Sequence, residues 1–279
     1  MVDRTSAVAG SAIGQSSVRA LAWDSDHFGF QVGEIVSPTL CDEDLAAALT
    51  FAGNAGHRLV YWSTQPNRNL PDWFDAFGAR RVNHRVQYSA DLNSDQAESK
   101  LFAIDPQMRI VACPPGPAGE SLTELAIRAG AHSRFHVDPR VPLDRFESLY
   151  QIWVDRSTRR ELADQVFVAT PSGAVDEAVG FITVSENGGA GRIGLLAVHP
   201  NHRGRGIGGL LIENAHSWMR KHEVRTVSVV TQLENIPACR LYARWNYAPI
   251  NIQAWFHFWL DSGMHAVETQ IPDRCTGAV

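Results

Sequence analysis

Apolar and polar positions alternate along the chain in patterns that predict a series of strands and helices. The apolar run Ile193–Val198 predicts a buried strand, and the apolar residues within Ile207–His222 recur at helical spacing. A second strand, rich in β-branched residues, is expected at Thr226–Thr231, and a short helix is expected after Asn235. The segment Ile250–Leu260 alternates strictly, as expected for a strand with one buried face.

The preceding part of the chain also reads as strands and helices. No internal repeat is obvious along the chain. Strands are expected at residues 31–36, 58–63, 82–92, 109–113, 165–169 and 179–184, and helices at residues 43–52, 70–77, 122–129 and 143–154. The last two of these strands are expected to form a hairpin around residues 171–173.

The length of 279 residues favours two domains. We expect a smaller α/β N-terminal domain over residues 18–105, ending in a polar linker at 95–100, and a second domain over residues 106–262. Residues 1–17 are expected to form a flexible N-terminus, and residues 263–279 a C-terminal tail.

A glycine-rich turn connects the strand Ile193–Val198 to the helix after it, with the sequence Arg203-Gly-Arg-Gly-Ile-Gly208. Such a turn presents backbone N–H groups, and the helix N-terminus adds a partial positive charge. Two arginines in the turn can bind phosphate oxygens. The turn therefore predicts a pyrophosphate site, and a glycine-rich turn without a ligand is the alternative.

Two common phosphate-binding motifs are excluded at this turn. No Gly-Lys-Ser/Thr sequence follows it, so it is not the loop of nucleotide triphosphatases. The glycine spacing also differs from the dinucleotide fingerprint, and no acidic residue stands at a strand end about 20 residues further on.

Asn235 and Tyr242 form a second candidate constellation. Asn235 is suited to cap a helix that has Pro237 in its first turn. Asn235 and Tyr242 are seven residues apart, so both side chains can face the same side of this helix. The alternatives are a plain helix cap for Asn235 and a buried core aromatic for Tyr242.

Together these residues resemble the GNAT superfamily of acyl-CoA N-acyltransferases. Arg203, Gly206 and Gly208 occupy its Arg/Gln-x-x-Gly-x-Gly/Ala signature, whose loop holds the pyrophosphate of coenzyme A. Asn235 and Tyr242 resemble its Asn-x-x-Ala-x-x-x-Tyr motif, in which the Asn contacts the pantetheine arm and the Tyr lies near the thioester sulfur. The resemblance implies the GNAT fold, an α/β (α+β) arrangement with a mixed, largely antiparallel sheet flanked by helices.

One residue departs from the family pattern. Residue 246 is Asn where the family usually has Gly. Asn is the commonest substitute for Gly in a left-handed helix cap, so we expect this conformation at Asn246.

The resemblance implies acetyl-CoA, or another acyl-CoA, as co-substrate. The cofactor-binding residues that it implies are Leu196, Ala197, Val198, Arg203, Gly204, Arg205, Gly206, Ile207, Gly208, Asn235 and Tyr242. A neutral amine would attack the thioester directly in a ternary complex. The backbone N–H near Val198 would stabilise the oxyanion, and Tyr242 would protonate the leaving thiolate. No general base is assigned, and Glu186 and His199 are only candidates.

Two further segments resemble the TDP-fucosamine N-acetyltransferases, which acetylate the amine of dTDP-4-amino-4,6-dideoxygalactose. The segment Trp23–Gly29 looks like their Trp-Asp/Glu-Ser-x-x-Phe motif, and Ser133, Arg134 and Phe135 look like their Ser-Arg-Phe segment on the acceptor side. Ser133, Arg134 and Phe135 are therefore expected to bind the substrate, a nucleotide-linked amino sugar. The alternatives are an Asx-type turn with buried Trp23 and Phe28, and a structural salt bridge for Arg134.

Other functions stay open at this level. The same chemistry on an antibiotic, an amino acid or a protein N-terminus is the first alternative. A non-catalytic sensor that binds coenzyme A is the second, although binding alone does not need the phenol of Tyr242.

Composition narrows the partners of the chain. The net charge of −5 argues against nucleic acid or a membrane surface as a partner. No apolar run approaches the roughly 20 residues that span a bilayer, and the N-terminus does not resemble a signal peptide. Four scattered cysteines, at positions 41, 113, 239 and 275, suggest reduced thiols and a cytoplasmic location.

Two weaker patterns concern a metal and a second copy of the chain. His132 and His136 are four residues apart, but no third ligand has suitable spacing, so no metal is expected. Trp255 and Trp259 fall on the face of the last strand that is expected to be exposed, where they suggest an interface in a homodimer.

Overall fold

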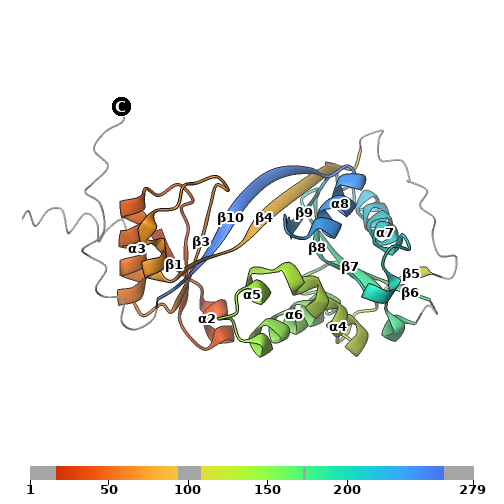
Figure 1. Cartoon of the computed structure of the whole chain (residues 1–279). Coiled ribbons are helices and arrows are strands. Elements are labelled where there is room, and N and C mark those ends of the chain that lie inside the picture. Colours follow the sequence, from red (N-terminus) through yellow and green to blue (C-terminus); the bar gives the residue numbers. More distant parts are fainter. Residues whose placement is uncertain (1–16, 94–107, 172–173, 261–279) are drawn as a thin grey trace, which may run out of the picture. The chain divides into compact units, whose positions relative to one another are not determined.

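The computed structural model describes residues 17–93, 108–171 and 174–260, which form two compact units (Figure 1). Of the described residues, 17–84 and 253–260 form the N-terminal unit, and those between Arg85 and Ile252 form the C-terminal unit. Four sequence expectations lie wholly or largely outside the described residues: the flexible N-terminus, the 95–100 linker, the tip of the 171–173 turn and the C-terminal tail.

The N-terminal unit is a small sheet covered by a helix. Its elements are β1 (Val18–Ala20), α2 (Ala22–Phe28), β2 (Val32–Ile35), α3 (Asp42–Asn54), β3 (Leu59–Thr64) and η1 (Asp72–Phe77). Its strands lie in the order β1-β2-β3-β10, where β10 (Ala248–Trp259) contributes its C-terminal part. β2 and β3 are parallel, whereas β3 and β10 are antiparallel. Leu45 and Leu49 of α3 are fully buried against this sheet.

The C-terminal unit is built on a larger sheet with the strand order β4-β9-β8-β7-β6-β5. Its strands are β4 (Ala79–Asp91), β5 (Arg109–Ala112), β6 (Gln165–Thr170), β7 (Gly180–Asn187), β8 (Ala190–Val198) and β9 (Thr226–Gln232). Its helices are α4 (Glu120–Ala129), η2 (Gly130–His132), α5 (Arg134–Val137), α6 (Leu143–Thr158), η3 (Val175–Glu177), η4 (Pro200–His202), α7 (Ile207–Lys221) and α8 (Ile236–Arg244). Only β8 and β9 are parallel neighbours in this sheet, so the expected mixed, largely antiparallel fold is confirmed.

The strands β4 and β10 each belong to both units. β4 begins in the N-terminal unit, and its residues from Arg85 to Asp91 pair with β9 in the C-terminal unit. β10 begins in the C-terminal unit, and its residues from Ala254 to Trp259 pair with β3 in the N-terminal unit. Each sheet therefore contains a strand whose other end belongs to the other unit.

Helix α7 covers one face of the C-terminal sheet. Leu211, Ile212 and Met219 are fully buried there with the strand residues Ile193 and Val229. Each such side chain stabilises the fold by about 1.5–3 kcal/mol relative to exposure. This packing fixes α7, and with it the loop at its N-terminus, against the end of β8.

The expectation that Trp259 is exposed was wrong. Trp259 is 2% exposed, and its ring lies 5.7 Å from that of Phe30, so it cannot form an exposed interface. His257 is also fully buried, next to Tyr61, because β10 is covered on both faces at this end. Alternation correctly predicted the face that contacts α3 but could not show that other residues cover the second face.

The segment Trp23–Gly29 is a helix rather than an Asx-type turn. α2 ends at Gly29, which adopts a left-handed conformation with φ of 78°. Phe28 is buried, whereas Trp23 is 42% exposed and stacks on His27. The alternative of an Asx-type turn with a buried Trp23 therefore does not hold.

Two further features concern helix length and the cysteines. No helix within the described ranges is long and apolar enough to cross a membrane. Cys41, Cys113 and Cys239 are free thiols, and Cys275 lies outside the described residues.

Candidate functional site

The site begins where the parallel strands β8 and β9 separate. Their paired register runs from Ala190 and Thr226 to Ile193 and Val229. β8 continues to Val198 without β9 as a partner, while β9 continues to Gln232 paired only with β4. The two strands therefore diverge toward the ends at which α7 and α8 follow them.

A β-bulge accompanies this divergence. The register between β7 and β8 shifts between Ile182 and Val184, so that Gly194 and Leu195 lie opposite Thr183. The Leu195 amide donates a hydrogen bond of 2.8 Å to Thr183 Oγ1 instead of to a backbone carbonyl. A Cβ atom at Gly194 would lie 2.7 Å from the same oxygen, which explains the glycine. Bulges bend a strand and redirect its groups.

The bulge determines which amides of β8 face the diverging side. The amides of Leu195 and His199 donate hydrogen bonds of 2.8 Å toward the β7 side. Because groups alternate along a strand, the amides of Leu196 and Val198 point to the opposite side, where β9 has moved away. Two backbone N–H donors thus line the divergence, including the expected one at Val198.

The glycine-rich turn adopts the geometry that its sequence predicted. Gly204 and Gly206 have φ of 75° and 76°, in the left-handed region that favours glycine. Gly206 is the N-cap of α7, and the first hydrogen bond of the helix runs from the Leu210 amide to the Gly206 carbonyl. The amides at the start of α7 therefore have no acceptor within the helix and can bind an anion.

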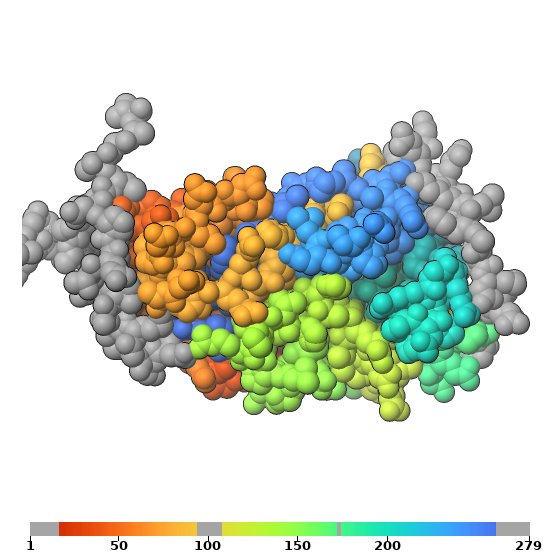
Figure 2. Space-filling view, viewed as in Figure 1, coloured from red at the N-terminus to blue at the C-terminus, as the bar shows by residue number. Residues whose placement is uncertain are grey.

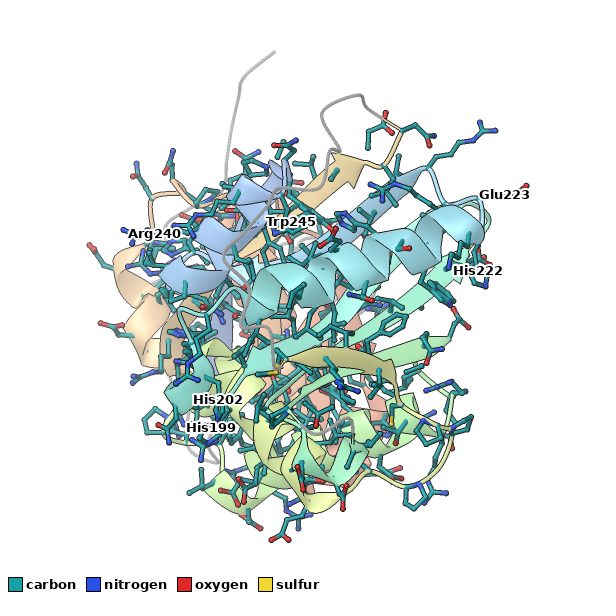
Figure 3. All side chains as sticks on the ribbon, turned by 90° about the vertical axis from the view of Figure 1, so that its right-hand side faces the viewer. His199, His202, His222, Glu223, Arg240 and Trp245 are labelled. Carbon is teal, nitrogen blue, oxygen red and sulfur yellow. The ribbon has the colours of Figure 1, made fainter. Side chains whose placement is uncertain are left out.

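Both arginines of the turn are exposed to solvent. Arg203 Nε donates a hydrogen bond of 3.1 Å to the Val198 carbonyl, which holds its guanidinium beside the end of β8. Figure 3 labels His199 and His202 in the segment just before this turn, and Figure 2 shows the turn and the start of α7, in cyan, at the surface.

The helices α7 and α8 meet beside the turn. A Cβ atom at Gly208 would lie 3.1 Å from Leu241 Cδ2, so glycine permits the close approach. In Figure 3, α8, with Arg240 and Trp245, lies beside the N-terminal part of α7, away from His222 and Glu223 at its other end. The signature glycine therefore also serves helix packing.

Asn235 caps α8 as expected. Its side-chain oxygen accepts a hydrogen bond of 3.3 Å from the Ala238 amide, and Pro237 stands in the first turn. Asn246 follows the helix with φ of 62°, which confirms the expected left-handed conformation. The cap leaves the amide group of Asn235 with further donors for a ligand.

Tyr242 is the only buried residue of α8 and is 4% exposed. Its ring lies 6.0 Å from that of Tyr88 and 5.6 Å from that of Tyr247. Burial raises the pKa of Tyr242 well above its usual value, so the phenol keeps its proton at neutral pH. Tyr242 can be a buried core aromatic and a proton donor at the same time, because a buried phenol can also act as an acid.

Tyr88 and Tyr247 lie beside Tyr242, and His216 contacts Tyr247; the sequence did not indicate these contacts. Burial and a hydrogen bond with the Cys239 thiol raise the pKa of Tyr88 to about 12. The ring nitrogen Nε2 of His216 and Tyr247 Oη form a buried hydrogen bond of 2.7 Å. Burial lowers the pKa of His216 to about 4. In the sequence, the only sign of this buried hydrogen bond is the polar residue His216 on an otherwise apolar face of the helix.

The three expected acceptor-binding residues have different environments. Ser133 is buried and caps α5, accepting a hydrogen bond from the His136 amide. Phe135 is buried with its ring 6.5 Å from that of Trp153. Arg134 is half-buried, and its guanidinium lies 4.7 Å from the centre of the Phe135 ring. Packing accounts for Ser133 and Phe135, so Arg134 is the member best placed for a ligand.

Arg134 is one of several cations in this unit. Burial, followed by the charges of Arg134 and Arg192, lowers the pKa of Arg85. Arg134 and Arg192 therefore each lie within electrostatic reach of Arg85. Such a group favours an anionic ligand.

Other candidates lose support. The backbone of Ser133 is extended, with ψ of 154°, and separates His132 from His136, so the two histidines do not share a helix face. Across the described residues no group of three or more metal-binding side chains is found. Glu186 pairs with Gly191, seven residues before Val198, or about 23 Å along an extended strand, which makes it a poor general base for this site.

Comparison with known proteins places this geometry in context. Residues 131–247 match the family model described as the Acetyltransferase (GNAT) family. The spore coat polysaccharide biosynthesis protein SpsD of Bacillus subtilis is 29% identical over 147 residues, which are 52% of this chain and 50% of that protein. The dTDP-fucosamine acetyltransferase of Escherichia coli O6:H1 is 31% identical over 123 residues, which are 44% of this chain and 51% of that protein. The chain thus spans about half the length of these relatives.

A shorter match and two solved structures complete the comparison. The streptothricin acetyltransferase of Escherichia coli is 39% identical over 49 residues, which are 18% of this chain and 28% of that protein. A GCN5-related N-acetyltransferase from Sphaerobacter thermophilus has a TM-score of 0.56 at 17% identity, covering 87% of this chain and 76% of that one. A tandem GNAT protein from the clavulanic acid biosynthesis pathway has a TM-score of 0.54 at 16% identity, covering 82% and 75%. At these identities the structures support the fold alone.

Proposed function

Residues 131–247 belong to the GNAT acetyltransferase family, and from this premise we propose that the chain is an acyl-CoA-dependent N-acyltransferase. In the proposed reaction, an acetyl group passes to the amine of a nucleotide-linked amino sugar. The observation that carries the proposal is that three features meet at one end of the C-terminal sheet. β8 and β9 diverge there, the glycine-rich turn opens α7 there, and α8 brings in Tyr242.

The turn fits the pyrophosphate of coenzyme A. Left-handed glycines at 204 and 206 turn successive amides outward at the start of α7. The exposed guanidinium groups of Arg203 and Arg205 add positive charge at the same place. Acyl-CoA, when bound, supplies an activated thioester.

The divergence of β8 and β9 fits the acyl end. The amides of Leu196 and Val198 are fixed by the strand and can donate to the carbonyl oxygen as negative charge develops on it. Tyr242 retains its proton because burial raises its pKa, and it can give that proton to the leaving thiolate. The amine loses one proton as the amide forms, and the Tyr242 phenolate regains one through solvent, so the protons balance. No covalent enzyme intermediate is needed.

The nucleotide-sugar part of the proposal rests on two supports. One named relative is a dTDP-fucosamine acetyltransferase, and another is a polysaccharide biosynthesis protein. The positive charge of Arg85, Arg134 and Arg192 suits the phosphates of a nucleotide sugar.

An antibiotic acceptor is the second candidate, because one short match is to a streptothricin acetyltransferase. The positive charges of the same three arginines argue against an antibiotic acceptor, because they would repel a cationic antibiotic.

The proposal can be tested by thiol release from acetyl-CoA with a panel of acceptors. The panel contains dTDP-4-amino-4,6-dideoxyhexoses, free amino sugars, streptothricin and amino acids. Turnover with the nucleotide sugars alone is expected. Turnover with streptothricin or an amino acid would keep the chemistry and reject the proposed acceptor.

A further inference from the structure

The N-terminal unit and the second half of the C-terminal unit contain the same succession of elements. In the first, β2, α3, β3, η1 and β4 follow one another. In the second, β8, α7, β9, α8 and β10 do so, with the additional short helix η4 between β8 and α7. In both, the first two strands are parallel neighbours with a helix between them in the sequence. A short helix and then a long strand complete each series.

Backbone landmarks repeat with the elements. Gly56 and Glu223 have φ of 84° and 59° in the connections from α3 to β3 and from α7 to β9. Gly78 and Asn246 have φ of 61° and 62° in the connections from η1 to β4 and from α8 to β10. A left-handed residue often follows a helix, so these matched pairs show that both helices of the two series end in the same way.

A sequence match follows once the elements are aligned. Asn67, Phe74 and Gly78 repeat the spacing of Asn235, Tyr242 and Asn246. The repeat was not obvious in the sequence because few residues besides these are shared. Phe74 stands in the place of Tyr242 but lacks the hydroxyl that could transfer a proton.

The two series exchange their last strands. β4, the last strand of the first series, pairs with β9 from Arg85↔Gln232 to Asp91↔Thr226. β10, the last strand of the second series, pairs with β3 from Ala254↔Thr64 to Trp259↔Leu59. Each last strand therefore completes the sheet of the other series by an equivalent antiparallel pairing.

The first series lacks the divergence that forms the site in the second. β2 and β3 stay paired up to Ile35↔Trp62, where β2 ends. Beyond that point Trp62 Nε1 donates a hydrogen bond of 2.9 Å to the Ser37 carbonyl. Thr64 Oγ1 donates one of 2.8 Å to the Pro38 carbonyl. Side chains of β3 thus hold the β2–α3 connection against the strand.

The charge at the start of α3 is also reversed. Three acidic residues occupy the first turn of α3: Asp42, Glu43 and Asp44. At the corresponding position, α7 is preceded by the basic residues Arg203 and Arg205. Arg68 forms an ion pair with Asp42, donates a hydrogen bond of 2.7 Å to the Leu40 carbonyl, and lies 4.8 Å above the Trp62 ring. Carboxylates stabilise a helix N-terminus but repel a pyrophosphate.

We propose that the N-terminal unit is a second copy of the cofactor-binding half, with its acyl-CoA slot closed by its own side chains and its last strand exchanged. The chain accordingly binds one acyl-CoA, in the C-terminal unit, and the N-terminal copy serves to supply β4 to that unit. The location of the single site rests on the proposed function.

Calorimetric titration with coenzyme A tests the closed slot. One molecule per chain is expected, and Gly206→Val should weaken binding at least 100-fold and leave no second phase. Arg68→Ala should keep the stoichiometry, with affinity within about twofold. Two sites in the wild type, or a site that persists in Gly206→Val, would overturn the inference. Absence of any coenzyme A binding would reject the proposed function. The exchange of the strands β4 and β10 would then be tested by hydrogen exchange alone.

Hydrogen exchange of the full chain tests the exchanged strands. Phe74 is buried in the N-terminal unit just before β4. Phe74→Ala should lower the protection of β3 and β9 amides together, each at least tenfold, because β4 links both cores. Phe74→Leu is a milder variant if Phe74→Ala does not fold, and exposed Trp23→Ala should change neither strand. Loss of protection in β3 with β9 unchanged would contradict the exchange.

Discussion

Leu195 donates its amide hydrogen to Thr183 Oγ1 across 2.8 Å, at the point where the register between β7 and β8 shifts. One hydroxyl thereby replaces the carbonyl that a regular ladder would offer. The bulge that it holds directs the amides of Leu196 and Val198 toward the side that β9 leaves open. The orientation of the proposed oxyanion donors thus depends on a side chain that would not itself touch the substrate.

This relationship predicts the effect of Thr183→Val. The substitution leaves the Leu195 amide without its acceptor, at a cost of about 1–3 kcal/mol in unfolding free energy. Turnover should also fall, because the donors on β8 lose their orientation. Denaturant unfolding and thiol release measure the two effects, and Thr183→Ser should restore both. An equally impaired Thr183→Ser would show that the hydroxyl is not what matters.

Tyr242→Phe should lower turnover by about 100-fold or more, because the thiolate loses its proton donor. Affinity for acetyl-CoA should change little, since the ring remains in place. Steady-state kinetics and calorimetry separate the two quantities. Tyr88→Phe removes a neighbouring phenol and should keep most of the activity. Full activity of Tyr242→Phe would exclude Tyr242 as the acid.

Arg203→Ala should weaken binding of coenzyme A by about tenfold or more, the effect of losing a charge-assisted hydrogen bond of about 1.5–3 kcal/mol. Calorimetry gives the dissociation constant directly. Lys221→Ala removes the same charge at the other end of α7 and serves as the control. If both variants bind equally well, the pyrophosphate does not lie at the turn.

Stability should depend on pH through His216. Burial lowers its folded pKa to about 4, below the ordinary value of 6.5, so the unfolded chain binds the proton more readily. The contribution of the neutral ring is complete above pH 6.5 and is lost as pH falls toward 4, by up to about 3 kcal/mol. Urea unfolding at several pH values should show this slope.

The matched variants for this experiment are His216→Gln and His222→Gln. His216→Gln cannot be protonated and should flatten the slope, whatever its absolute stability. His222 is exposed at the end of α7, so His222→Gln should keep the slope. A slope that survives in His216→Gln would assign the pH dependence to another group.

Local patterns in the sequence predicted most elements and the turn. Helical spacing after Gly206, the cap at Asn235 and the left-handed Asn246 depend on neighbours only a few residues away, and the structure confirms each of them. Properties that depend on distant segments were not accessible. Nothing near Thr183 signals that its hydroxyl meets Leu195, and nothing near Trp259 signals that Phe30 covers it.

The partner of β4 is the clearest case. Its alternating pattern predicted a strand but placed it with the N-terminal segments that precede it in the sequence. Tyr88 on that strand faces Tyr242, across a separation that no local pattern can span. The candidate site was therefore predicted from its loop and helix residues, whereas its contribution from β4 required the structure.

The path of β4 and β10 also limits how the protein can be cut into pieces. A fragment that begins at residue 106 would contain the turn, α7 and α8 but not β4, although β9 pairs with β4 along its whole length. β9 would then present an open row of amides and carbonyls at the edge of the sheet, which invites aggregation. A fragment intended to retain acyl-CoA should therefore begin no later than Ala79, and one that is insoluble without β4 would say nothing against the chemistry of the site.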